Sequence, residues 1–376
     1  MKIGILKESE PENRVALIPE GVKALNDMKL EVLVEKDAGE KAFFADGQFT
    51  EAGATVVSRS EILKQADILL KINPPGISEI KNIKENKVII AMLDPFFNKE
   101  LVTELVKHKI TSFSMELVPR ISRAQSMDIL SSMATIAGYK AVLDAAGHLS
   151  KFFPMFMSAA GTIKPAKVLI LGAGVAGLQA IAISRKLGAV VEVFDVRSAV
   201  KEEVKSLGGK FVEVEGAVED ASAGGYAVEQ TEEFKRKQAQ LIHDHAVKSD
   251  VVICTAQIPG KKAPLLVRKE TVDQMQAGSV IVDLAASTGG NCELTENNKT
   301  IVHKQVTIIG NSDYPSDMPK DASSMFGKNC INFIKLLVDE EGKLNLDFED
   351  EILKGACLTH NGEVVNEKVK EQITAK

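Results

Sequence analysis

Short apolar runs alternate with stretches of helical periodicity along the first third of the chain. The runs that predict strands are Lys2–Leu6, Glu31–Glu35, Thr55–Val57, Ile68–Lys71, Val88–Met92 and Thr111–Ser114. Between them, Pro19–Met28, Ser60–Gln65 and Lys99–Lys107 repeat apolar side chains with the spacing of an amphipathic helix. Strands that alternate with helices favour a parallel sheet covered on both faces, so we predict an open, doubly wound α/β layer.

The same alternation begins again at Lys167 and continues to about Asn311. Its predicted strands are Lys167–Leu171, Val190–Asp195, Lys210–Val214, Val251–Thr255, Val280–Leu284 and Val306–Ile309. The intervening segment is rich in small residues, which predicts a closely packed helix. We therefore expect an α/β fold with two Rossmann-like doubly wound parallel-sheet domains joined by long helices.

The expected domain boundaries follow from this alternation. Residues 1–127 together with 321–376 are expected to form a discontinuous N-terminal domain, because a chain end often returns to the first domain. Residues 145–320 form the second domain and residues 128–144 the linking helix.

Charge and hydropathy narrow the class of protein. Among the 376 residues, 46 lysines and arginines stand against 52 aspartates and glutamates, a net charge of −6, which argues against DNA or RNA as a partner. No apolar run approaches the ~18–20 residues that cross a bilayer. The N-terminus, MKIGILKESE, is charged where a signal peptide is apolar, so we expect a cytoplasmic protein.

We expect no metal site. The 4 cysteines are far apart and form no metal-binding spacing, so we interpret them as buried, reduced thiols. His243 and His245 lie two positions apart on a predicted helix, residues 232–248, and side chains with that spacing point to different sides.

A dinucleotide fingerprint follows the first strand of the second domain. After the buried run Val168–Leu171, three glycines recur as Gly172-x-Gly174-x-x-Gly177, and the pattern of a helix follows. In such a motif the glycines make the tight turn, admit a pyrophosphate and pack the helix on the strand. The next strand ends in Asp195, 23 positions after Gly172 (195 − 172), close to the usual ~20 for the acid that binds the adenosine ribose.

The acid also favours one cofactor over another. A 2′-phosphate beside the Asp195 carboxylate would be repelled by several kcal/mol at an effective dielectric constant of about 20, so we expect NAD(H) rather than NADP(H). Arg197, two residues further on, has two interpretations: it softens this repulsion, or it is an ordinary solvated side chain after the strand.

Longer stretches resemble one family closely. They are Lys7–Pro19 (KESEPENRVALIP), Pro119–Ser132 (PRISRAQSMDILSS), Gly172–Gly177, Pro259–Pro264 (PGKKAP), Val282–Ala285 (VDLA), Gly289–Glu293 (GGNCE) and Ile309–Ser316 (IGNSDYPS). Over essentially its whole length the chain resembles the NAD(H)-binding component of proton-translocating nicotinamide nucleotide transhydrogenases. It is more distantly similar to alanine dehydrogenases. The RAQSMD block is specific to the transhydrogenase branch.

This resemblance implies roles for particular residues. Arg120, Gln125, Asp128 and Ser131 are expected to line the nicotinamide and to orient its carboxamide and ribose. An amide, a carboxylate and a hydroxyl suit a carboxamide that offers donors and an acceptor. The alternative is that Asp128 and Ser126 merely cap the helix that follows.

A polar, glycine-rich stretch, residues 216–231, is expected to fold over the bound nucleotide, with Tyr226 contacting the adenosine end. An ordinary surface loop is the alternative. The full set of expected cofactor-binding residues is Gly172, Gly174, Val175, Ala176, Gly177, Asp195, Val196, Arg197, Tyr226, Ala256 and Gln257.

Two charged groups of alanine dehydrogenases are missing here. Their substrate-binding arginine and lysine correspond to Arg14 and Lys71, which we interpret as relics or structural ion-pair partners. Their acid/base histidine does not occur, because the strand end reads Ala-Met-Leu-Asp94-Pro, and the later aspartate is absent after Asp283. Hydride exchange between two nicotinamides needs neither group, because it needs only close approach of the rings and exclusion of water.

The resemblance therefore predicts the NAD(H)-binding alpha chain of a proton-translocating transhydrogenase. Its expected partners are a second copy of itself in a homodimer, an NADP(H)-binding component and a membrane-spanning component. It would lie peripherally on the inner face of the cytoplasmic membrane. The alternatives are an alanine-dehydrogenase-like amino-acid dehydrogenase and a redox-sensing NAD-binding module without catalysis.

Overall fold

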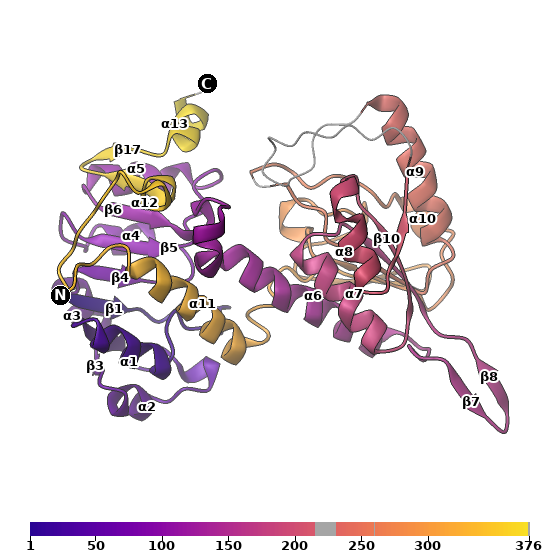
Figure 1. The fold of residues 1–376 in the computed structure, drawn as a ribbon, viewed down its shortest axis with the longest axis horizontal. Coiled ribbons are helices and arrows are strands. Elements are labelled where there is room, and N and C mark those ends of the chain that lie inside the picture. Colours follow the sequence, from indigo (N-terminus) through magenta and orange to yellow (C-terminus); the bar gives the residue numbers. More distant parts are fainter. Residues whose placement is uncertain (215–230, 259, 375–376) are drawn as a thin grey trace. The chain divides into compact units, whose positions relative to one another are not determined.

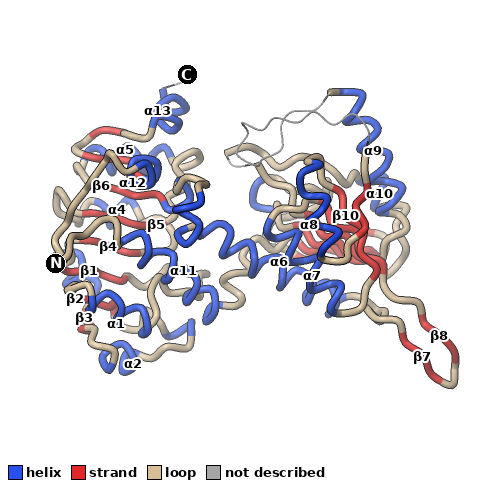
Figure 2. Tube along the Cα trace, viewed as in Figure 1, coloured by secondary structure: helices blue, strands red, loops and turns tan. Residues whose placement is uncertain are grey.

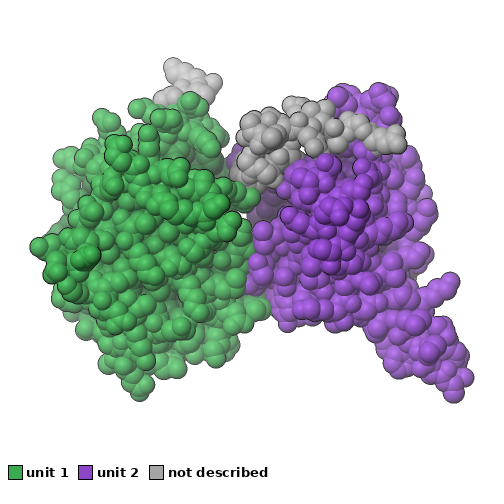
Figure 3. All heavy atoms as spheres, in the orientation of Figure 1, with its two compact units in different colours: residues 1–133, 315–376 green, residues 134–314 purple. Residues whose placement is uncertain are grey.

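The computed structural model describes residues 1–214, 231–258 and 260–374. The chain forms two compact units (Figure 3): residues 1–133 with 315–376 make unit 1, and residues 134–314 make unit 2. Residues 315–320, which we expected in the second domain, belong to unit 1. One reason is that Ser316 accepts a hydrogen bond from the Asn13 backbone N–H (2.9 Å).

Unit 1 is built on an eight-stranded sheet of order β17-β16-β6-β5-β4-β1-β2-β3 (Figure 1). Its parallel strands are β1 (Lys2–Ile5), β2 (Glu31–Glu35), β3 (Thr55–Val57), β4 (Ile68–Leu70), β5 (Val88–Ala91) and β6 (Thr111–Ser114). The sequence pattern predicted all of these strands.

Two short antiparallel strands extend this sheet, and the pattern did not predict them. They are β16 (Cys357–His360) and β17 (Glu363–Val364). Asn361 and Gly362 join them with φ values of 50° and 80°. Two central residues with positive φ are typical of a tight hairpin turn, so the Asn-Gly pair was the signal that could have predicted it.

The helices of unit 1 cover its sheet. They are α1 (Pro19–Asp27), α2 (Asp46–Glu51), α3 (Arg59–Gln65), α4 (Ile77–Ile80), α5 (Lys99–Lys107), α11 (Pro319–Ile334), α12 (Glu351–Ala356) and α13 (Glu367–Thr374), with the 3-10 turns η1 (Glu40–Ala42), η2 (Met115–Leu117) and η3 (Ser122–Met127). Figure 2 distinguishes these helices from the strands by colour. Within the described ranges, no helix combines the length and apolar character needed to span a bilayer.

Unit 2 contains a seven-stranded sheet of order β11-β10-β9-β12-β13-β15-β14. Its strands are β9 (Lys167–Leu171), β10 (Val190–Phe194), β11 (Lys210–Val212), β12 (Val251–Cys254), β13 (Val280–Asp283), β14 (Thr300–His303) and β15 (Val306–Ile309). The edge strand β14 is antiparallel to its neighbour and was not predicted, because only alternate side chains are partly buried.

Successive side chains of β9 enter two different cores. Val168 and Ile170 pack with residues of α6 (Ile129–His148) and α7 (Val175–Lys186), whereas Leu169 and Leu171 pack with α9 (Glu232–Ala246). This alternation buries both faces of the parallel sheet. The smaller helices are α8 (Lys201–Ser206) and α10 (Lys269–Val272), with 3-10 turns η4 (Ser198–Val200) and η6 (Ala286–Thr288).

A separate hairpin, β7 (Phe156–Ser158) and β8 (Gly161–Ile163), projects from the body of unit 2 (Figure 1). We did not predict it from the sequence. Its side chains are largely apolar and exposed, and Phe152 stacks on Phe156 with ring centroids 5.0 Å apart.

The small residues of α6 allow a close helix contact inside unit 2. A Cβ added to Gly138 would lie 2.1 Å from the carbonyl oxygen of Ala176 in the first turn of α7. Only a glycine fits this approach without a shift of the backbone. The contact explains the small-residue composition of this helix.

We predict that Gly138→Ala destabilises the protein by ~1–3 kcal/mol, the usual cost of overpacking a tight contact. Gly147→Ala on the same helix is the matched control. No atom lies within 4 Å of its added Cβ, and it should be neutral or stabilising by up to ~1 kcal/mol. Urea unfolding of both variants measures the difference; equal midpoints would contradict the contact.

Candidate dinucleotide-binding site

The glycine turn after β9 has the geometry of a phosphate-binding turn. Gly172 has a φ of 103°, and a Cβ there would lie 2.6 Å from Thr255 Oγ1. A Cβ on Gly177 would lie 2.0 Å from the Gly172 carbonyl oxygen, which presses α7 onto the turn. In contrast, nothing lies within 4 Å of the Cβ position of Gly174, the N-cap residue of α7. The turn is therefore tight beneath and open above the helix N-terminus, where an anion is stabilised.

The sheet topology places this turn where doubly wound sheets bind ligands. From β9 the strand order runs to β10 and β11 on one side and to β12 and β13 on the other. The loops that follow β9 and β12 thus diverge at a switch point, which opens a crevice at the carboxyl edge of the sheet. Gly172 follows β9, and Thr255 follows β12.

Asp195 directly follows β10 and is already hydrogen-bonded on both oxygens. Its Oδ2 accepts from the Ala173 N–H (2.7 Å) and from the Arg197 guanidinium (2.7 Å). Its Oδ1 accepts from the Arg197 N–H (2.8 Å) and Nε (2.9 Å). A carboxylate has about four acceptor positions, so a ribose that binds Asp195 has to replace part of this set. Arg197 is an ion-pair partner here rather than a purely solvated side chain.

Other predicted cofactor residues surround the turn. Val175 is partly exposed at the start of α7, next to Ala176, and Val196 packs partly against the core. Gln257 is exposed on the loop after β12, where its Nε2 donates to the Leu284 carbonyl (3.0 Å). Tyr226 lies outside the described residues.

Ala256 differs from its neighbours because both its backbone groups are used internally. Its N–H donates to Asn291 Oδ1 (3.0 Å), and its carbonyl accepts from Asn291 Nδ2 (2.9 Å). Asn291 is a buried residue that the sequence reasoning missed. The GGNC sequence around it was the available signal, although the spacing alone assigns it no role.

In unit 1 the structure brings together two of the four predicted nicotinamide residues. Asp128 accepts hydrogen bonds from the Ser131 N–H (2.9 Å) and Oγ (2.6 Å) at the start of α6. This is the N-cap geometry that was the alternative interpretation. Each carboxylate oxygen retains a further acceptor position, so capping and ligand binding are compatible. Gln125 and Arg120 are exposed nearby in the chain.

The segment that carries these residues is fixed by the C-terminal part of unit 1. Asn329 of α11 donates to the Ser126 carbonyl (2.8 Å), and Arg123 forms two hydrogen bonds with Asp350 (2.7 and 2.8 Å). These hydrogen bonds lower the pKa of Asp350. Sequence reasoning missed both anchors, because more than 200 residues separate them from the segment.

Arg14 and Lys71 are both buried beside the chain's own carboxylates. Arg14 forms a bidentate pair with Glu12 (2.8 and 2.6 Å), and Lys71 lies 3.8 Å from Glu8 and 3.9 Å from Glu79. Burial would raise the pKa of Glu12, but the hydrogen bonds and charge of Arg14 outweigh it and lower that pKa to about 2. The structure therefore agrees with the interpretation of Arg14 and Lys71 as ion-pair partners.

The two histidines considered for metal binding have separate partners. His243 Nδ1 lies 2.9 Å from Thr271 Oγ1, and His245 Nδ1 lies 2.6 Å from Glu192. In the portion of the chain that the structure describes, no three acidic, histidine or cysteine side chains form a group that could hold a metal ion. The cysteines carry free, buried thiols, and burial raises the pKa of Cys292 to about 11.

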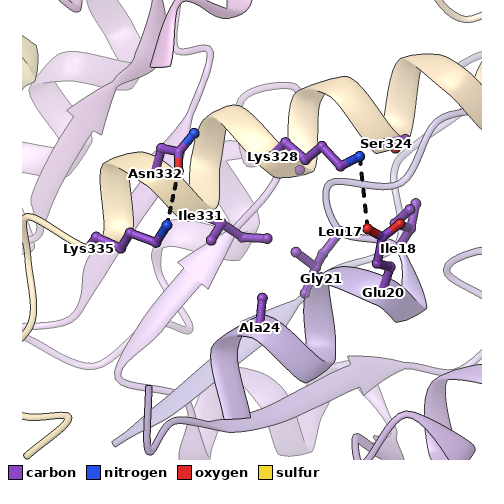
Figure 4. Close-up of a pocket in the computed structure, with 11 residues that line it drawn as sticks. Leu17, Ile18, Glu20, Gly21, Ala24, Ser324, Lys328, Ile331, Asn332 and Lys335 are labelled. Atoms are coloured by element: carbon purple, nitrogen blue, oxygen red, sulfur yellow. Dashed lines mark hydrogen bonds and ion pairs between the residues drawn. The ribbon is translucent and has the colours of Figure 1, made fainter. Parts of the chain in front are cut away.

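A pocket of about 340 Å³ lies in unit 1, between α1 and α11 (Figure 4). Leu17 and Ile331 contribute apolar surface to it, and Lys328 pairs with Glu20 at 3.9 Å. None of the predicted site residues lines this pocket. It is separate from the glycine turn, which belongs to unit 2.

Two doubly wound sheets with a glycine turn at a switch point define a protein of the dinucleotide-binding α/β class. Family models identify it further. Residues 4–137 match the N-terminal domain and residues 141–367 the C-terminal domain of "Alanine dehydrogenase/PNT". The chain belongs to this family, as the sequence resemblance predicted.

Individual relatives agree with the transhydrogenase branch. The chain is 49% identical to an NAD(P) transhydrogenase subunit alpha protein of Rhodospirillum rubrum, covering 97% of this chain and 98% of that protein. It is 30% identical to an alanine dehydrogenase of Staphylococcus epidermidis over 99% of this chain and 96% of that one. A solved transhydrogenase from Sinorhizobium meliloti has 44% identity and a TM-score of 0.89, covering 97% and 100% of the two chains.

We predict that Asp195→Ala weakens NADH binding and reduces discrimination against NADPH by at least ~10-fold, or about 1.4 kcal/mol. The variant loses an acceptor for the ribose and the repulsion of a 2′-phosphate, while the Arg197 guanidinium loses its partner carboxylate. Fluorescence titration with both nucleotides measures the ratio. Asp244→Ala, at an exposed position on α9, is the control; NADH affinity unchanged by Asp195→Ala would contradict the ribose assignment.

Proposed function

We propose that this chain is the NAD(H)-binding component of a proton-translocating NAD(P) transhydrogenase. It holds NADH while a hydride passes directly to NADP⁺ on a partner subunit, and a membrane-spanning component couples this transfer to proton movement. Membership of the family and the 49% identity to a transhydrogenase alpha subunit support the proposal. The chain is then a peripheral protein on the cytoplasmic side of the membrane through its partners.

The proposed binding mode uses the turn and the acid described above. The pyrophosphate of NAD(H) lies over Gly174 at the N-terminus of α7, and the adenosine ribose binds Asp195. The nicotinamide carboxamide and ribose are oriented by Arg120, Gln125, Asp128 and Ser131. The Asp128–Ser131 pair offers acceptor positions and a hydroxyl to a group with both donors and an acceptor.

The reaction in this proposal moves one hydride and no proton between the nucleotides. The C4–H bond of NADH breaks with its electron pair, a C4–H bond forms on NADP⁺, and the products are NAD⁺ and NADPH. The chain's own residues orient the ring and exclude water, because the reacting atoms have to approach to about 3–3.5 Å.

The observation that carries this reaction over amino-acid dehydrogenation is the ion pairing of Arg14 and Lys71. Both cations face carboxylates of the chain itself, which satisfy the charges that a substrate carboxylate would otherwise match. In addition, Asp94 and not a histidine follows β5. The alternative, an alanine-dehydrogenase-like enzyme, lacks the group that would accept the proton.

The decisive assay mixes the chain with an NADP-loaded transhydrogenase partner component. We expect hydride exchange between NADH and an NADP analogue only when both proteins are present. Alanine with NAD⁺ should give no NADH with the chain alone. Turnover of alanine would contradict the proposal, and NADH binding without any exchange would favour a sensing module.

We further propose that the chain is a homodimer and that the β7–β8 hairpin lies in the interface. Met157 is 71% exposed, and Phe156 and Ile163 are also exposed on this short two-stranded element. An isolated hairpin is at best marginally stable in water, and a contiguous apolar surface is typical of an interaction site.

Met157→Ser combined with Ile163→Ser is expected to shift the dimer toward monomer, because it removes apolar area outside either core. Analytical ultracentrifugation measures the mass, and the urea midpoint should change little. Val302→Ser is the matched control, since Val302 is 69% exposed elsewhere in unit 2. A hairpin variant that remains as dimeric as the control would contradict this interface.

A further inference from the structure

A buried asparagine joins the loops that follow β12 and β13. Asn291 has no exposed surface, although its side chain is polar. A buried amide has to find partners for its donors and acceptor. Here all of the partners are backbone groups of the loop after β12, which forms one side of the crevice at the switch point.

The amide clasps Ala256 from both sides. Its Oδ1 accepts from the Ala256 N–H (3.0 Å), and its Nδ2 donates to the carbonyls of Ala256 (2.9 Å) and Pro264 (2.8 Å). One side chain thus supplies the pairing that a neighbouring strand would otherwise give. It fixes the backbone of the loop after β12 at two points.

Asn291 is itself held in place by an acid at the end of β13. Its N–H and that of Cys292 donate to Asp283 Oδ2 (2.8 and 2.9 Å), and Thr295 Oγ1 donates to the same oxygen (2.8 Å). The Asn291 carbonyl accepts from the N–H groups of Leu266 and Val267 (2.8 and 2.9 Å). Side chain and backbone of Asn291 are therefore both immobilised.

The loop held in this way touches the glycine turn directly. Thr255, the residue before Ala256, donates from Oγ1 to the carbonyl of Gly172 (3.0 Å). The Ala256 nitrogen lies 3.2 Å from the position of a Gly172 Cβ. A continuous set of contacts thus runs from Asp283 through Asn291 and the loop to the first glycine of the fingerprint.

We infer that Asn291 is a positioning residue of the dinucleotide site: it holds the loop after β12 against the glycine turn and so sets the width of the crevice. This inference rests on the proposed binding of NAD(H). The strand order places β12 on the opposite side of β9 from β10, which leads to Asp195. Asn291 therefore acts on the portion of NAD(H) that extends away from the adenosine ribose.

The test compares a whole dinucleotide with its adenosine half. Asn291→Ala should weaken NADH binding roughly tenfold or more, while the affinity for 5′-AMP changes by less than about twofold. Isothermal titration calorimetry measures both affinities in each variant. Because a buried asparagine is risky to remove, Thr255→Ala serves as a second variant: it cuts the next contact and should give the same split between the two ligands.

Ser279→Ala is the matched control. Ser279 is also buried in unit 2 and donates to the Ser249 carbonyl (3.3 Å), but it lies just before β13, at the opposite end of that strand from Asp283. Neither affinity should change in this variant.

Two results would overturn the inference alone, provided that the wild-type chain binds NADH. The first is an equal loss of NADH and 5′-AMP affinity, which would indicate a general structural defect. The second is wild-type affinity for both ligands in both variants. A wild-type chain that binds neither nucleotide would instead overturn the proposed function, and this inference with it.

Discussion

The close packing of one turn is the constraint on which the nucleotide site depends. Gly172 can approach the loop after β12 only without a side chain, and Gly177 can approach Gly172 for the same reason. These contacts bring two loops from neighbouring strands together at the switch point. They also leave the N-terminus of α7 open above Gly174, where backbone amides and the helix dipole can meet a pyrophosphate.

The two units use the same topological feature in different ways. In unit 2 the switch point between β9 and β12 carries the open glycine turn. In unit 1 the switch point lies between β1 and β4, and buried ion pairs occupy it. Isolated buried charges cost several kcal/mol, so Arg14 and Lys71 persist there because Glu12, Glu8 and Glu79 compensate them. This difference fits a chain whose second reactant is bound by another protein.

Much of the fold could be predicted from the sequence, because the strands of parallel sheets are continuous apolar runs between amphipathic helices. The short antiparallel strands β14, β16 and β17 could not, since two to four half-buried residues carry almost no periodicity. Within the site, the glycines and Asp195 were predicted by spacing. Asn291 and the Asn329 anchor were not, because their roles come from backbone partners distant in the chain.

The central claim is that NADH on this chain gives its hydride directly to a nucleotide on a partner protein. The most direct measurement starts from NADH that carries deuterium at the transferred C4 position, mixed with the chain and an NADP⁺-loaded partner in ordinary water. The account predicts NADPH that retains the deuterium, with none released to solvent, and no reaction when the partner is omitted. NADPH that carries solvent protium at C4, or oxidation of NADH by the chain alone, would contradict it.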